Sequence, residues 1–193
     1  MGRSSPDATA AADHRRELLV LGILRWQALS AYAIDRAVRR HTVLYRGLRH
    51  GNVYNLVGRL AESGYIGGRS GKANRGPAAS KIVYHVTPKG EQRFRQILEA
   101  VLYDTAADDC SLQIALVLLT QLRRSQATRM LERRNRELIA QERRLKRLYG
   151  DSSRSAAASL AGAHAVSRLQ SEKRFVSDAL RLIAKRSSYP DWE

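Results

Sequence analysis

The segment from Gly51 to Ser63 carries polar side chains of the kinds that hydrogen-bond to DNA bases. Its apolar residues recur at the i, i+3, i+4 and i+7 spacing that forms one face of a helix: Val53, Leu56, Val57 and Leu60. The opposite face then carries Gly51, Asn52, Asn55, Arg59 and Glu62. Asparagine can form two hydrogen bonds with adenine, and arginine two with guanine, in the major groove. The spacing therefore predicts a helix that packs through one face and contacts bases through the other.

Because any exposed helix face is polar, a second basic feature is needed to favour nucleic acid. A glycine-rich stretch over residues 67–80 supplies it, with almost no acidic residue nearby. The cations of this stretch, with the one that follows it, are Arg69, Lys72, Arg75 and Lys81. Such a loop can follow the phosphate backbone of DNA or enter the minor groove. The alternative interpretation is a loop that is simply solvated. Arg49 and His50 precede the helix, where the dipole and free amides favour phosphate, and Arg49 is the stronger candidate.

Three helices are expected before the basic loop. Helical periodicity starts near Glu17 and continues through the apolar run Leu18–Leu24, which we expect to be buried. A second helix follows Ser30, which is a suitable N-cap. The third helix ends at Ser63, and Gly64 stands where a C-cap is expected.

Two strands and a fourth helix are expected after it. Tyr65-Ile66 and the β-branched run Lys81–Val86 flank the basic loop and predict a hairpin. Thr87-Pro88 predicts the start of the next helix. Helix, helix, helix, basic hairpin, helix is the order of a winged helix-turn-helix, in which one helix enters the major groove. The fold class predicted for the chain is mainly α with a small β-hairpin wing.

The last ninety residues predict helices only. A short apolar helix is expected from about Ser111 to Arg123, a long charged helix from about Gln126 to Tyr149, and a last one that ends near Lys185. The two long helices carry narrow apolar stripes: Leu131, Leu138, Leu145, Val166, Leu169, Val176, Leu180 and Ile183. A narrow stripe must be covered, by the other long helix, by a second copy of the chain, or by both. We predict three parts: a mobile arm (1–14), a winged helix-turn-helix DNA-binding domain (15–103) and a helical dimerisation domain (104–193).

The composition restricts the function classes. The chain has 193 residues, 34 Lys and Arg against 18 Asp and Glu, and a formal net charge of +16, which favours a polyanion as partner. Residues 1–103 carry most of the excess, at net +10. A single cysteine, Cys110, excludes an internal disulfide and a thiolate zinc cluster, and we expect it to be a packing residue. The apolar runs are too short for a membrane span and no signal peptide is visible, so a cytoplasmic protein is expected.

The chain also resembles the PadR-type transcriptional regulators over about residues 17–100. The segment Gly51–Leu60 is similar to the family's Gly-Ser/Thr-Leu-Tyr-Pro-x-Leu-x-x-Leu, and Lys81–Gly90 to its Lys/Arg-x-Tyr-x-Leu-Thr-x-x-Gly. Five residues match in register: Tyr54, Gly64, Tyr84, Thr87 and Gly90. Asn55 stands where the family has Pro, and Asn52 where it has Ser or Thr, so the operator sequence cannot be taken from relatives.

The resemblance implies a homodimer, joined by its C-terminal helices, that binds an inverted-repeat operator in double-stranded DNA and represses a nearby gene. It implies a DNA contact for Tyr54, whereas the helical wheel allows packing at the helix flank equally well. A small hydrophobic or phenolic effector is a further candidate partner, and Trp26 and Trp192 are the aromatic side chains that could line its site. No cofactor, metal or membrane partner is expected.

Two other functions compete with a sequence-specific regulator. A nonspecific nucleoid or RNA-binding protein would explain the charge, but it would bind operator and random DNA alike. A helical adaptor for a protein partner would show little dependence on salt. An enzyme is not expected, because the five histidines are scattered and the loop over residues 67–76 lacks the ending of a phosphate-binding loop.

Overall fold

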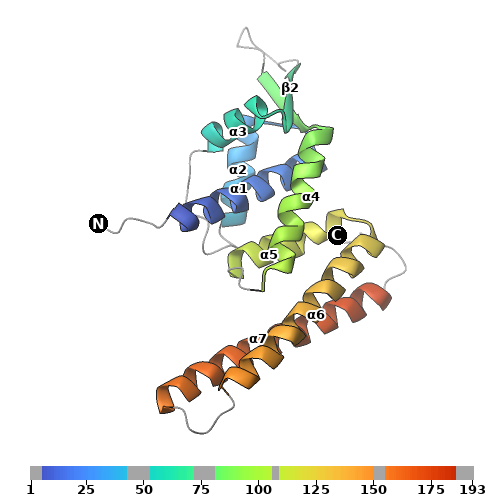
Figure 1. Cartoon of the computed structure of the whole chain (residues 1–193). Helices are drawn as coiled ribbons and strands as arrows, with labels where there is room; N and C mark the ends of the chain where they lie inside the picture. The colour runs from blue at the N-terminus through green and yellow to red at the C-terminus, as the bar shows by residue number, and fades with distance from the viewer. Residues whose placement is uncertain (1–5, 43–52, 72–80, 106–108, 150–154, 186–193) are drawn as a thin grey trace. The chain divides into compact units, whose positions relative to one another are not determined.

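The computed structural model describes residues 6–42, 53–71, 81–105, 109–149 and 155–185 (Figure 1). They form helices and one small sheet, so the predicted fold class, mainly α with a small hairpin, is confirmed. The chain divides into two compact units, Met1–Val101 with Asp108–Leu118, and Leu102–Ala107 with Leu119–Glu193. Within the described ranges, every helix is shorter or less apolar than a membrane span requires.

The first helix, α1 (Pro6–Trp26), begins well before the predicted start near Glu17. The prediction of an arm over residues 1–14 is therefore corrected for residues 6–14, which are helical, while residues 1–5 lie outside the described residues. Proline is favoured in the first turn of a helix, and the alanines that follow are strong helix formers, although they show no amphipathic period. The apolar run after Glu17 is buried as predicted, with Leu18, Val20 and Leu21 fully covered.

Helices α2 (Ala31–Thr42) and α3 (Val53–Glu62) follow in the first unit and contact each other. Ser30 caps α2 as predicted, because its Oγ accepts a hydrogen bond from the amide of Ala33 at 3.3 Å. Helix α3 buries the four apolar residues of the predicted face: Val53, Leu56, Val57 and Leu60.

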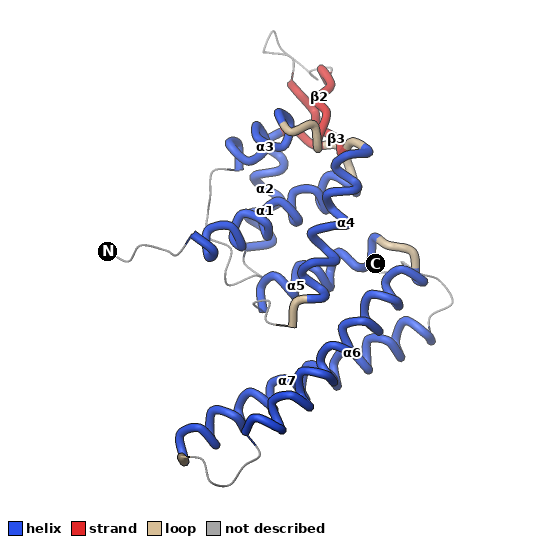
Figure 2. The backbone as a smooth tube through the Cα atoms, in the orientation of Figure 1, coloured by secondary structure: helices blue, strands red, loops and turns tan. Residues whose placement is uncertain are grey.

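The sheet has three antiparallel strands in the order β1-β3-β2. Figure 2 labels two of them, β2 and β3. Strands β2 (Ile66–Gly71) and β3 (Lys81–Val86) form the predicted hairpin, with Ile66 opposite Val86 and Gly71 opposite Lys81. Strand β1 (Leu29–Ser30) pairs with Tyr84 and Val83 of β3 and was not predicted. Two residues are too few to show a strand period in a sequence, so this pairing is a tertiary result.

The end of α3, the sheet and α4 (Pro88–Tyr103) meet at one threonine. The Thr87 hydroxyl donates to the carbonyl oxygen of Gly64 at 2.7 Å and accepts from the amide of Gly90 at 3.1 Å, which confirms Thr87 as the cap of α4. Gly64 has φ of 71°, a backbone conformation that glycine adopts without strain. At Gly90 a Cβ would collide with the carbonyl oxygen of Tyr65. This junction fixes how the hairpin leaves α3.

Helix α5 (Asp109–Leu118) belongs to the first unit, where it packs on α1. Gly22 permits this contact, because a Cβ there would collide with the side chain of Leu118. The predicted boundary after residue 103 assigned this helix to the C-terminal region, and the division of the chain places it with the N-terminal one. Its apolar character alone could not say which unit would bury it.

The second unit is a helical hairpin. A 3₁₀ turn (Leu119–Gln121) leads into α6 (Arg124–Tyr149), which packs along α7 (Ala156–Lys185) (Figure 1). The buried residues at this contact include Leu131, Leu138, Leu169, Val176 and Ile183. The side chain of Tyr149 fills the space where Gly162 has none, so the two backbones approach closely at that end.

Candidate nucleic-acid interface

Helix α3 presents a polar face to solvent and a buried apolar face to the first unit. Tyr54, Asn55, Arg59 and Glu62 are exposed, whereas the four apolar residues of the helix are at most 6% exposed. The division of the helix predicted from its spacing is therefore confirmed. An exposed α-helix with Asn and Arg on one face has the shape and the hydrogen-bonding groups that fit the major groove.

Tyr54 stands at the edge of this face with 51% of its surface exposed. It is not a core residue, so its phenol is available to solvent and to a partner. The neighbouring cation is Arg39 of α2, whose pKa is raised mainly by its hydrogen bond to Asp35 at 2.7 Å and to a lesser degree by Tyr54. The exposed face of α3 thus continues onto a basic part of α2.

The β-hairpin adds an exposed cation beyond α2 and α3. Arg69 is exposed on β2 and lies opposite Val83 of β3. Lys81 begins β3 opposite Gly71. The remaining predicted contacts lie outside the described residues: Arg49, His50, Asn52, Lys72 and Arg75.

Other arginines of the first unit hold the fold together. Arg93 donates to both carboxylate oxygens of Glu17, at 2.7 and 2.9 Å, and this hydrogen bond raises the pKa of Arg93. Arg25 pairs with Glu91 at 2.9 Å and stacks over the Phe94 ring at 4.4 Å. These partly buried ion pairs connect α1 to α4. Arg25 and Arg93 are therefore structural cations, unlike those on the exposed face.

A model of the transcriptional regulator PadR-like family matches residues 20–96. Residues 20–96 therefore resemble this family, and we call them the PadR-like domain. The match includes the whole of α2, α3 and the hairpin, and it supports a DNA-binding transcriptional regulator.

Several solved structures are similar to the chain over most of its length. Bacillus subtilis PadR in complex with operator DNA is 20% identical, with 86% of this chain and 98% of that chain covered and a TM-score of 0.38. Bacillus subtilis PadR in complex with p-coumaric acid is 17% identical, with 95% and 100% covered and a TM-score of 0.39. The protein smu.1604c from Streptococcus mutans UA159 is 16% identical, with 86% and 98% covered and a TM-score of 0.39. The comparison with curated proteins finds no significant match.

The PadR-like domain explains why its motif residues stand in register. Gly64, Thr87 and Gly90 form the junction between α3, the hairpin and α4. Tyr84 pairs with both neighbouring strands, opposite Leu29 of β1 and Gly68 of β2. Four of the five matched residues therefore serve the geometry of the wing, while Tyr54 lies on the exposed helix.

The residues predicted for dimerisation lie mainly inside the chain. Leu131, Leu138, Leu169, Val176 and Ile183 are at most 5% exposed within the second unit, and Leu145, Val166 and Leu180 are half-buried. Their first role is to join α6 to α7 of one chain. A second chain would have to use other faces of these helices.

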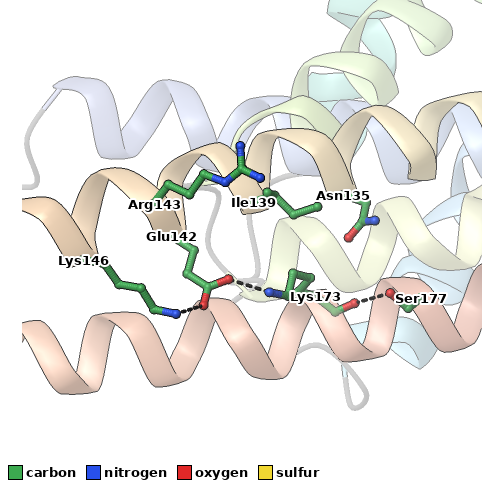
Figure 3. A pocket seen from close by; sticks show the side chains of 7 residues that line it. All are labelled: Asn135, Ile139, Glu142, Arg143, Lys146, Lys173 and Ser177. Atoms are coloured by element: carbon green, nitrogen blue, oxygen red, sulfur yellow. Dashed lines mark hydrogen bonds and ion pairs between the residues drawn. The ribbon is translucent and has the colours of Figure 1, made fainter.

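The helical hairpin of α6 and α7 contains buried charged side chains that were not predicted as site residues. Arg134 is fully buried, pairs with Glu172, and donates to the carbonyl oxygens of Leu102 at 2.8 Å and Asp104 at 3.2 Å. Glu142 accepts a hydrogen bond from Lys173 and pairs with Lys146 (Figure 3). It also accepts a hydrogen bond from Gln170 at 2.9 Å. The bonds from the two lysines lower the pKa of Glu142 to about 2. Each residue looks like surface charge in an Arg-rich helix, and only the packing of α7 shows otherwise.

An open groove of about 450 Å³ borders Glu142 (Figure 3). It is lined mostly by polar residues: Asn135, Ile139, Glu142, Arg143, Lys146, Lys173 and Ser177. This lining does not match the hydrophobic effector that the family resemblance implies. Of the two predicted aromatic walls, Trp26 is 72% exposed at the end of α1, and Trp192 lies outside the described residues.

Proposed function

We propose that the protein is a sequence-specific DNA-binding repressor that acts as a homodimer on an inverted-repeat operator. The observation that carries this proposal is the exposed face of α3, where Asn55 and Arg59 stand opposite a buried apolar face in a PadR-like domain. Both side chains can form paired hydrogen bonds to base edges, Asn55 with adenine and Arg59 with guanine. Such a protein would work where the chromosome is, in the cytoplasm.

The charge distribution supports contacts to phosphate beside these base contacts. The sequence up to residue 103 has a net charge of +10, and Arg69 extends the cationic surface onto β2. Phosphate contacts position a protein on the duplex, whereas contacts to base edges give it sequence preference. Charge alone would serve a nonspecific nucleoid protein equally well, so the preference for one sequence is the property to measure.

The outward face of α7 is the surface that we assign to the second copy of the chain. Leu160, Phe175 and Leu182 are 72%, 50% and 42% exposed. Their separations of 15 and 7 residues are close to whole numbers of helical turns, so they share one side of α7, opposite Leu169 and Val176. Self-association through this stripe would cover it and would pair two PadR-like domains, as an inverted repeat requires.

An effector is a separate proposal that rests on the family resemblance alone. Bacillus subtilis PadR forms a complex with p-coumaric acid. Phenolic acids are therefore the first class of compound to test as effectors of this protein. Release of the operator by one of these compounds would support a ligand-controlled regulator. A screen in which no compound releases the operator would leave a regulator without a ligand of this class.

The decisive experiment is a footprint on the promoter region beside the protein's own gene. A repressor of this kind protects two half-sites related by a dyad and separated by about one helical turn, ~34 Å. It should bind that site at least ~10³-fold more tightly than a random duplex of equal length. Equal affinity for both duplexes would instead favour a nonspecific DNA-binding protein.

A further inference from the structure

Gly58 occupies the middle of the exposed face of α3. It lies one turn after Tyr54 and Asn55 and one turn before Glu62, and all three of these side chains are exposed. On a helical wheel it is nearly opposite the buried residues Val53 and Leu60. The centre of the proposed DNA-contacting face therefore carries no side chain.

The described part of the fold gives no reason for a glycine at this position. Among the residues that the structure describes, no atom beyond its own stretch of helix lies within 4 Å of the place where a Cβ would be. The other described helical glycines differ, because a Cβ at Gly22, Gly90 or Gly162 would collide with Leu118, Tyr65 or Tyr149. Glycine is also the poorest helix former after proline, so Gly58 weakens α3 without any packing benefit from the residues that the structure describes.

We propose that Gly58 is the point where the backbone of α3 comes closest to the DNA duplex. This inference rests on the proposed function and deepens it, because it names a residue that sets how deeply the helix enters the groove. Asn55 has a short side chain, and its amide reaches a base edge only if the helix backbone lies close to the base pairs. A side chain at position 58 would project from the same face and hold the helix away. The occupant of the open space beside Gly58 is thus the edge of a base pair or its sugar.

The test compares Gly58→Ala and Gly58→Leu with the unmodified protein, using a labelled duplex that spans the promoter region of its own gene. Both variants should melt at a higher temperature, because alanine and leucine are stronger helix formers than glycine. Both should bind the promoter duplex more weakly, Gly58→Leu by about tenfold or more, which is the loss of one good base contact. Affinity for a random duplex should change much less.

Ala100→Leu is the matched control, since it adds a leucine at another exposed helical position of the same unit. It should leave promoter binding unchanged. A double-mutant cycle provides the second measurement. In an Asn55→Ala background the loss caused by Gly58→Leu should shrink, because the contact that depends on close approach is already absent.

Three outcomes would contradict the proposal. Unchanged promoter affinity of Gly58→Leu would overturn it, with the proposed function still standing. A lower melting temperature of Gly58→Ala would also overturn it, because the fold itself would then require the glycine. An unmodified protein that binds no duplex at all would overturn the proposed function first, and this inference with it.

Discussion

Arg134 of α6 and Glu172 of α7 form an ion pair in the interior of the second unit, and Arg134 is fully buried. The guanidinium also donates to the backbone carbonyls of Leu102 and Asp104, so it joins α7 and the end of α4 to α6. A buried charge is costly unless its partners are present, and here several partners surround one cation. The pair therefore links three separate parts of the chain.

Replacing Arg134 by methionine should destabilise the protein strongly. The change leaves Glu172 with its charge and without its main partner, and removal of one member of a buried pair costs about 3–5 kcal/mol. Urea unfolding would measure the loss of stability. The control is Arg144→Met, which changes an exposed residue of the same helix. An unchanged midpoint of urea unfolding for Arg134→Met would show that the Arg134–Glu172 pair does not stabilise the α6–α7 helical hairpin.

The stability of the α6–α7 helical hairpin should depend on pH because of Glu142. Its pKa is lowered from 4.5 to about 2 by Lys146 and Lys173, so the folded state holds the carboxylate charged more strongly than the unfolded state does. The resulting stabilisation is complete above pH 4.5 and is lost as the pH falls from 4.5 towards 2.

Glu142→Gln tests this dependence because glutamine keeps the size of the side chain without its titration. We expect the variant to be less stable than the unmodified protein at pH 6, and the difference to narrow as the pH falls below 4.5. Melting temperatures of both proteins across this range provide the measurement. A difference that stays constant down to pH 3 would contradict the assigned pKa.

Asn55→Ala and Arg59→Ala should weaken binding to the operator by about 1–3 kcal/mol each and affect random DNA much less. Each change removes one candidate contact to a base edge from the exposed face of α3 while leaving its buried face intact. Titration of both duplexes at one salt concentration measures the effect, with Arg144→Ala as the matched arginine control. Equal losses on the two duplexes would mean that these side chains do not distinguish bases.

Arg69→Ala should behave differently, because we propose that this exposed arginine of the β-hairpin contacts phosphate. We expect weaker binding to all duplexes by a similar factor, and a slope of log K against log salt that is smaller by about 1. Binding measured at four or five salt concentrations determines the slope. A loss confined to one operator sequence would instead assign a base contact to Arg69.

The adjacent residues Phe175 and Val176 separate self-association from folding. Phe175 is half exposed on the outward face of α7, whereas Val176 is buried against α6. If the protein is the proposed homodimer, Phe175→Ser should shift it from dimer to monomer with little change in helicity, and Val176→Ser should unfold the α6–α7 helical hairpin. Sedimentation and circular dichroism distinguish the two effects. If the Phe175→Ser protein remains dimeric, the outward face of α7 is not the dimer surface.

The amino-acid sequence determined the local structure of the first unit well. The face of α3, the cap at Ser30 and the turn at Thr87 follow from the spacing of a few side chains and from the chemistry of their neighbours in the chain. The start of α1 was missed because an alanine-rich segment has high helix propensity but no period.

Only the tertiary structure decided which charged and which small residues matter. Arg134 and Glu142 are two of many charged residues on α6, and their burial depends on where α7 lies, which no local spacing encodes. Gly58 and Gly22 are equally ordinary in the sequence, yet a Cβ at Gly22 would meet Leu118, whereas a Cβ at Gly58 would meet none of the described residues beyond its own helix. Periodicity along a chain specifies one face of an element, whereas the surroundings of that face arise from contacts between residues far apart in sequence.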